Sequence, residues 1–155
     1  MTAHRIGVIS DTHGLLRDGL VSLLAGCDLI IHAGDIGDPS ILHELRTISE
    51  VVAVRGNVDA GSWAQALKLC EIVEVSSRKM FVIHRLNDIA INPASEGIDA
   101  VIYGHTHRPD IRSTEGVLYL NPGSAGPRRF DLPVSMALME INEEGLSPEI
   151  VEIRT

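Results

Sequence analysis

Apolar runs alternate with breaker residues along the first two thirds of the chain. Short runs rich in Val, Ile and Leu are typical of buried strands, and Leu recurring every three or four residues is typical of a helix with one apolar face. The runs predict strands at 6–10, 28–33, 51–55, 71–75, 79–84 and 99–103. Between them, the spacing predicts helices at 15–25, from Pro39 to about Arg46, and, with a weaker pattern, at 62–68.

The last third of the chain carries only strand patterns. Gly, Pro and Asn turns separate predicted strands at 110–114, 116–120, 134–141 and 148–154. The order is therefore β-α-β-α-β followed by a β-meander. It predicts an α/β fold, a two-sheet mixed β sandwich flanked by helices. Because 155 residues is an ordinary domain length, we expect a single domain over residues 1–155.

Aliphatic side chains must supply most of the core, because hydrophobic residues make up 45% of the chain and aromatic residues only 3%. The formal charge is −8, from 13 basic and 21 acidic residues. Broad nucleic-acid binding and anionic-membrane binding need a basic face, so this balance argues against both. A phosphorylated substrate stays compatible with it, since bound divalent cations reverse the sign of the charge locally.

Two cysteines, Cys27 and Cys70, cannot build the disulfide framework that is typical of small secreted proteins. The N-terminus runs directly into a predicted strand without an apolar signal region. No apolar run approaches the ~20 residues that cross a bilayer. We therefore expect a cytoplasmic protein without a membrane partner.

Polar side chains with metal-binding chemistry follow five of the predicted strands: Asp11, His13, Asp35, Asn57, His84, His105 and His107. Ligands bind at the carboxyl ends of strands in open α/β sheets, so these side chains are expected to converge. The i, i+2 spacing within Asp11/His13 and His105/His107 places both members on one face of an extended backbone. Neighbouring glycines allow tight bends beside the cluster.

Carboxylate, imidazole and one carboxamide, without thiolate, suit Mn, Ni, Co, Zn or Fe better than Mg or Ca. Seven side chains exceed the needs of one ion, so we expect two divalent metal ions, with manganese first among these alternatives. Two such ions about 3.5–4 Å apart clamp the attacking and leaving oxygens of an in-line displacement. Two divalent ions carry four positive charges, and two Asp carboxylates with a bridging hydroxide neutralise three of them. The remaining positive charge matches the single negative charge of a phosphodiester.

The same residues lie in five ordered motifs, Asp11-Thr12-His13, Gly34-Asp35-Ile36-Gly37-Asp38, Gly56-Asn57-Val58-Asp59, His84, and Gly104-His105-Thr106-His107. Together the motifs resemble the calcineurin-like metallophosphoesterase superfamily. The short chain and the Asn121-Pro122-Gly123-Ser124 segment are similar to its small YfcE-type bacterial and archaeal phosphodiesterases. The resemblance extends from about residue 5 to residue 124.

This resemblance implies a ligand set. One ion is held by Asp11, His13 and His107, the other by Asn57, His84 and His105, and Asp35 bridges the two. It also implies hydrolysis of a small phosphodiester by a hydroxide bound between the metals. Asp35, Asn57 and His105 are then the catalytic residues, with Asn57 also contacting a phosphate oxygen.

Two departures from the family pattern affect the function. Val58 replaces the His that protonates the leaving group in related monoesterases, which favours diesters with good leaving groups, while a phosphomonoesterase stays the alternative. Asp59, which would orient that His, is left to cap a helix or contact the loop. Arg85 stands where the family often has Gly, and either binds substrate phosphate bidentately or points to solvent.

Several alternatives stay open. The Asn121–Ser124 segment is either a plain turn or part of the site wall, and Asp38 is expected to cap the helix after Pro39. We expect structural or surface roles for His4, His32 and His43, with His32 close enough to Asp35 to support it. A non-catalytic scaffold that resembles the superfamily's retromer sorting-complex subunit is disfavoured by seven intact ligand positions. Exposed strand edges make a homodimer or higher homo-oligomer reasonable.

Overall fold

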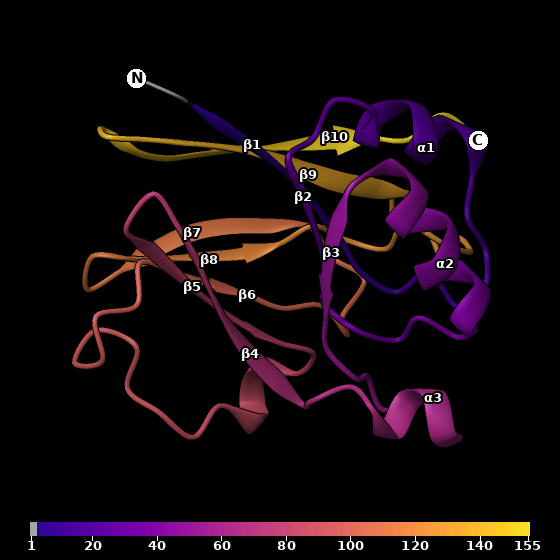
Figure 1. Ribbon diagram of the computed structural model, residues 1–155, viewed down its shortest axis with the longest axis horizontal. Coiled ribbons are helices and arrows are strands. Elements are labelled where there is room, and N and C mark those ends of the chain that lie inside the picture. The colour runs from indigo at the N-terminus through magenta and orange to yellow at the C-terminus, as the bar shows by residue number, and fades with distance from the viewer. Residues whose placement is uncertain (1–2) are drawn as a thin grey trace.

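The computed structural model describes residues 3–155 and consists of two five-stranded mixed sheets packed face to face (Figure 1). The first sheet has the order β10-β9-β1-β2-β3, with β1 His4–Ile9, β2 Leu29–His32, β3 Glu50–Ala53, β9 Ser135–Asn142 and β10 Gly145–Glu152. The second has the order β4-β5-β6-β8-β7, with β4 Cys70–Val75, β5 Arg78–Ile83, β6 Ala100–Ile102, β7 Asp110–Thr114 and β8 Val117–Asn121.

Two helices, α1 Asp18–Leu24 and α2 Pro39–Ile48, cover the outer face of the first sheet (Figure 1). Their buried leucines and isoleucines pack against Ile30 of β2. The Asp38 carboxylate accepts a hydrogen bond from the Ser40 N–H at 2.8 Å, so its expected role as a helix cap is confirmed. None of the helices within residues 3–155 is long and apolar enough to span a bilayer.

The outer face of the second sheet has a thinner cover. Phe81, Val101 and Tyr103 lie beneath the loop that follows β5, together with the partly buried Leu86 and Ile89. This loop contains the 3₁₀ turn η1 Leu86–Asp88. A short helix, α3 Ser62–Gln65, sits beyond the end of β3, to one side of the sandwich (Figure 1).

Aliphatic side chains and methionines fill the space between the sheets, as the composition predicts. Ile6 and Val8 of the first sheet and Val82 and Ile102 of the second are fully buried there. Burial of each such side chain stabilises the fold by roughly 1.5–3 kcal/mol. The predicted fold class is confirmed, and most strands lie within two residues of their predicted ends.

The predicted C-terminal meander is wrong. The β7–β8 hairpin joins the second sheet beside β6, whereas β9 and β10 join the first sheet beside β1. The reason lies in β9, which is apolar on both faces: Ala137 and Met139 enter the core between the sheets, while Met136 packs towards the helices. A strand with two apolar faces is stable only inside a sheet that is covered on both sides.

Parallel pairing sets the position of the site. Ile9, His32 and Ala53 are in register at the carboxyl ends of β1, β2 and β3. In the second sheet, Val82 and Ile102 are in register near the ends of β5 and β6. The loops that carry the motif residues therefore leave both sheets at one edge of the sandwich.

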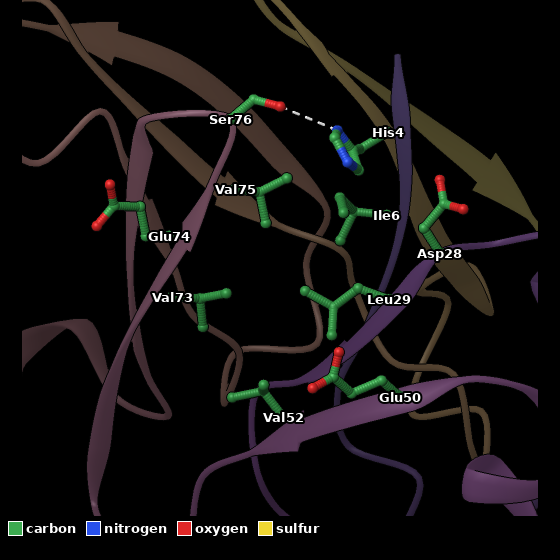
Figure 2. Close-up of a pocket in the computed structure, with 10 residues that line it drawn as sticks. All are labelled: His4, Ile6, Asp28, Leu29, Glu50, Val52, Val73, Glu74, Val75 and Ser76. Atoms are coloured by element: carbon green, nitrogen blue, oxygen red, sulfur yellow. Dashed lines mark hydrogen bonds between the residues drawn. The ribbon is translucent and has the colours of Figure 1, made fainter. Parts of the chain in front are cut away.

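The opposite end of the strands holds a groove of about 350 Å³ (Figure 2). Figure 2 shows Val73 and Val75 of β4 facing Ile6 and Leu29 of the first sheet. A hydrogen bond of 3.0 Å between the Ser76 hydroxyl and His4 Nδ1 links the two sheets across it. This groove lies at the starts of the parallel strands, so it is separate from the motif loops.

Candidate metal centre

The strand-end loops bring six of the seven predicted residues into two groups. Asp11, His13 and His107 form one group, and Asp35, His84 and His105 form the other. Within each group, the possible ligand atoms all lie within 4.8 Å of one another. Such spacing is compatible with a metal ion held between the side chains, with metal–ligand distances near 2 Å.

Asp35 belongs to the second group and also faces His13 of the first. Its Oδ2 atom is 3.1 Å from His84 Nε2 and 3.7 Å from His13 Nε2. Its Oδ1 atom accepts a hydrogen bond from the Val58 N–H at 3.1 Å. The carboxylate is thus fixed on one side and faces both groups on the other.

Asp11 is fully buried, and its Oδ1 atom faces three imidazoles. The distances from this oxygen are 3.3 Å to His107 Nε2, 3.6 Å to His13 Nε2 and 3.9 Å to His84 Nε2. Its Oδ2 atom accepts hydrogen bonds from the Ser10 hydroxyl and from the His105 N–H. One oxygen is therefore satisfied by the protein, and the other points into the cluster.

The donor atoms of the cluster fit a cation. Asp11 Oδ1, His13 Nε2 and His84 Nε2 are buried and have no hydrogen-bond partner within residues 3–155. Orphaned buried polar atoms are rare in folded proteins, and coordination of an ion satisfies such atoms. His84 Nδ1 lies 2.8 Å from the Ala33 carbonyl oxygen, so it carries the proton and leaves the Nε2 lone pair directed at the cluster.

Five of the seven candidate ligands have left-handed backbone, with φ of 58° at Asp11, 46° at His13, 56° at Asp35, 74° at His105 and 62° at His107. The expectation that Asp11/His13 and His105/His107 each share a face of extended backbone is therefore wrong, and His105 and His107 belong to different groups. A left-handed residue turns the chain sharply after the strand, and this turn brings the side chains together. Each such residue carries a strain of roughly 1–2 kcal/mol.

Two glycines allow the loops to approach one another closely. A Cβ on Gly56 would collide with the backbone and carboxylate of Asp35, and one on Gly104 would collide with Ser10 and the Asp11 carboxylate. The requirement at both positions is space, because neither glycine has a positive φ. The expected bending role of neighbouring glycines applies instead to Gly14 and Gly34, with φ 80° and 101°.

Asp59 ties the loop after β2 to the loop after β3. Its buried carboxylate accepts backbone N–H hydrogen bonds from Gly56 at 2.8 Å, Gly37 at 2.9 Å and Ile36 at 3.2 Å. Of the two roles expected for Asp59, contact with the loop is confirmed. The adjacent Val58 side chain is about half exposed, at 51%.

The Asn121–Ser124 segment holds two of the motif loops in place through side-chain hydrogen bonds. The Asn121 side-chain amide donates to the Gly104 carbonyl and to the Thr106 hydroxyl oxygen, at 3.2 and 3.0 Å. The Ser124 hydroxyl donates to the Asp11 carbonyl at 3.1 Å. These buried contacts join sequence-distant loops, and only the family resemblance pointed to them in advance.

The charges of the cluster favour ionised carboxylates. Burial alone would raise the pKa of Asp11, but the nearby imidazoles of His107, His13 and His84 outweigh it and lower that pKa. Burial would likewise raise the pKa of Asp35, and the contact with His84 and the Val58 N–H lower it. The nearby Asp11 carboxylate raises the pKa of His13. Both carboxylates are therefore charged at neutral pH, as cation ligands must be.

Asn57, His105 and Arg85 occupy the exposed side of the cluster. Asn57 and His84 border a pocket of about 310 Å³ that Arg85 also lines. The Arg85 side chain is 44% exposed, and its Nε lies 3.7 Å from the Asp88 carboxylate. The structure thus places Arg85 at a pocket rim that is also open to solvent, which combines the two positions expected from the sequence.

His32 is a buried support rather than a surface residue. Its Nδ1 accepts a hydrogen bond from the Gly34 N–H at 3.1 Å, so Nε2 carries the proton and donates to the Thr12 hydroxyl at 2.9 Å. Thr12 in turn donates to the Ile36 carbonyl. Burial lowers the pKa of His32 from 6.5 to about 4, so this network requires the neutral imidazole.

Several known proteins resemble this chain in sequence. A sequence model of the calcineurin-like phosphoesterase superfamily domain matches residues 5–144. A probable metallophosphoesterase of Methanocaldococcus jannaschii is 37% identical, over 96% of this chain and 81% of that protein. Another probable metallophosphoesterase, from Methanothermobacter thermautotrophicus, is 34% identical over 94% of this chain and 91% of its own length. A phosphodiesterase of M. jannaschii is 27% identical over 77% and 82%.

Solved structures share the fold. A predicted phosphoesterase from Streptococcus pneumoniae superposes with a TM-score of 0.74 at 26% identity, covering 98% of this chain and 91% of that chain. Vps29 from Entamoeba histolytica, complexed with zinc, has a TM-score of 0.73 at 25% identity, covering 97% and 99%. The phosphoesterase YfcE from E. coli has a TM-score of 0.70 at 23% identity, covering 97% and 100%.

The left-handed backbone at His105 predicts how substitutions at this position change the stability of the protein. At this exposed position with φ 74°, His105→Gly should give a more stable metal-depleted protein than His105→Ala, by about 1 kcal/mol. The exposed helical residue His43 is the matched control, because there Gly should be less stable than Ala by about 1 kcal/mol. Urea unfolding of the four variants measures both differences. A His105→Ala variant more stable than His105→Gly would contradict the left-handed conformation.

The low pKa of His32 predicts a pH dependence of stability. The unfolded chain binds a proton at His32 below pH 6.5, and the folded protein does so only near pH 4. Stability is thus fully present above pH 6.5 and is lost as the pH falls towards 4, by about 3 kcal/mol. In metal-depleted protein, His32→Asn should remove this part of the pH dependence, whereas His43→Asn should retain it. Parallel curves for all three proteins would refute the prediction.

Proposed function

The chain belongs to the calcineurin-like phosphoesterase superfamily, and from that premise we propose that it is a metal-dependent phosphodiesterase acting on a small phosphodiester. One observation carries the proposal: Asp35 of the second group of ligand atoms also faces the first group, and several buried atoms of the two groups lack partners within residues 3–155. The name of one relative, a phosphodiesterase, supports the same reaction.

The proposed ligand set follows the two groups. Asp11, His13 and His107 would hold one divalent ion, and His84, His105 and Asn57 would hold the other. Asp35 would serve both groups, since its carboxylate faces His84 and His13 at once. When bound, the ions lower the pKa of a shared water and neutralise charge on the phosphoryl oxygens. Manganese is the first choice, with nickel, cobalt, zinc and iron as alternatives.

The exposed side chains of the centre bind and orient the substrate. Asn57 and His105 face solvent, so their amide and imidazole groups are placed to contact the phosphoryl group. Burial, the charge of His84 and the charge of Arg85 lower the pKa of His105, which keeps this imidazole neutral at pH 7. The Arg85 guanidinium offers two N–H groups to phosphoryl oxygens.

The leaving group sets the preference for diesters. Val58 carries no proton to donate, and the neighbouring Asp59 carboxylate is fully engaged with three backbone N–H groups. Loss of a positioned general acid forfeits about 10²–10⁴-fold in rate for substrates that need one. Diesters with good leaving groups, protonated by water, are therefore favoured over ordinary monoesters.

A non-catalytic scaffold is the rival from a different class. The fold alone cannot separate it from an enzyme, because Vps29 has the same fold and its structure also contains zinc. Two features favour the enzyme. All seven candidate ligands are present, and the centre has an exposed side, at Asn57 and His105, through which a substrate reaches it.

Replacing Asp35 by Asn tests the shared carboxylate. Asp35→Asn keeps the shape but removes the charge that faces both groups, so metal content should fall. The kcat/KM for a diester should drop by more than the ~10–100-fold that loss of an outer partner of a ligand causes. Elemental analysis and diester kinetics measure both effects, with the exposed Asp18→Asn as control. A fully metal-loaded Asp35→Asn protein with the parent rate would overturn the mechanism.

A substrate and metal panel separates the alternatives. Metal-depleted protein receives Mn, Ni, Co, Zn or Mg and is assayed with bis(4-nitrophenyl) phosphate and 4-nitrophenyl phosphate. The diester should be the better substrate by about tenfold or more, because its single negative charge matches the metal centre. Faster monoester turnover would establish the monoesterase instead. Less than one bound ion per chain, with no turnover of either ester, would establish the scaffold.

A further inference from the structure

Two pockets flank Arg85 on the open side of the centre. The first, of about 310 Å³, is bordered by Asn57 and His84 and has Leu69 and Cys70 in its wall. The second, of about 270 Å³, is bordered by His105 and Thr106. Arg85 lines both pockets. Each pocket therefore adjoins a different residue of the group that contains Asp35.

We propose that the two pockets hold the two ester arms of the substrate, one in each, with Arg85 between them at the phosphoryl group. The inference rests on the proposed phosphodiesterase function and adds a substrate class to it. A diester has two arms and a monoester has one, so a centre with two adjoining pockets is matched to a diester. The pocket volumes limit each arm to about the size of a nucleoside.

The first pocket combines an apolar wall with charged groups. Leu69 is 60% exposed although it is a large apolar side chain, and Ile83 lines the same pocket. Arg55, Arg85 and Asp88 supply hydrogen-bond donors and acceptors around this wall. An arm with a flat apolar body and a polar edge satisfies both, and a nucleoside has that chemistry. A plain alkyl chain would leave the charged groups unused.

The second pocket has a rigid wall. Tyr103 is almost fully buried, and its hydroxyl donates to the Asp110 carboxylate at 3.0 Å. Leu86 contributes an apolar surface, and the exposed Asn87 stands at the rim. A fixed aromatic side chain beside an aliphatic one suits a second flat arm.

Arg85 is free to bind the phosphoryl group. Its ion pair with Asp88 is long, at 3.7 Å, and both side chains are about half exposed. Such pairs contribute little stability, so the guanidinium can turn to the substrate at small cost. Its planar pair of N–H groups matches two phosphoryl oxygens.

Cys70 reports whether the first pocket is occupied. It is exposed whereas Cys27 is buried, so N-ethylmaleimide should alkylate Cys70 selectively. In the metal-loaded protein, bis(4-nitrophenyl) phosphate at ten times its Kd should slow this alkylation about tenfold. Inorganic phosphate should not slow it. Mass spectrometry follows the modification while less than about a tenth of the ester is consumed, and Cys70→Ser identifies the site.

Blocking each pocket separately tests the two arms. Alkylation of Cys70 fills the first pocket, and Asn87→Trp fills the second. Each block should lower the kcat/KM for the diester by roughly 10-fold or more, the usual effect of losing an apolar subsite. The monoester should lose little from either block alone, because its single arm uses the other pocket, and should lose activity when both are applied.

Arg85→Gln completes the test, because the phosphoryl group is common to both esters. It should lower the kcat/KM for both by the same factor, whereas the exposed Arg46→Gln should change neither. Equal losses of diester and monoester activity on blocking one pocket would overturn the two-arm arrangement. Unchanged Cys70 alkylation with bound diester would overturn it as well. Absence of turnover in the unmodified protein would instead refute the proposed function, while the alkylation rates still report pocket occupancy.

Discussion

The structure depends on a buried negative charge, the carboxylate of Asp11, which is completely enclosed at the end of β1. An ionised group in the protein interior is strongly unfavourable unless hydrogen bonds and opposite charge surround it. Ser10 and the His105 N–H satisfy one oxygen, and three imidazoles face the other without reaching ordinary hydrogen-bond distance. The centre is therefore a charge that is only partly compensated by the protein itself. A cation completes the compensation, and for this reason metal binding and folding are coupled in such sites.

A second constraint is the backbone conformation of the loops that bring the candidate ligands to the Asp11 carboxylate. Left-handed backbone at five candidate ligands is strained, and isolated loops would relax out of it. Contacts from distant segments prevent this: Asp59 joins the loops after β2 and β3, and Asn121 and Ser124 support the loops of His105 and Asp11. Parallel strands in register supply the common edge from which all of these loops leave. The sandwich thus holds a geometry that no single loop would adopt.

Particular residues show how much of the fold and of the metal centre the sequence predicts. Short apolar runs bounded by breaker residues were enough for the strands and for the mixed two-sheet architecture, because strands covered on both faces are buried along their whole length. The strand-end positions of Asp35 and His84 were likewise visible in the order of motifs. The sheet that β9 joins was not, since hairpin patterns carry no information on their neighbours, and only its two apolar faces gave a hint. The left-handed φ at Asp11 and two of the three N–H contacts of Asp59, those from Ile36 and Gly37, depend on residues more than twenty positions away, so no local pattern records them.

The uneven exposure of the centre bears on what the protein does with a metal. Asp11, His84 and His107 are buried, whereas Asn57 and His105 are exposed, so the cluster is closed on the sandwich side and open on the other. A purely structural metal site is closed all round by protein ligands, and a catalytic one keeps a position for water or substrate. The two pockets lie on the open side, and Arg85, a cation in a chain of net charge −8, stands between them. A scaffold needs neither the opening nor a guanidinium beside it. These two features, more than the fold that the protein shares with Vps29, support the proposed hydrolysis of a two-armed phosphate ester.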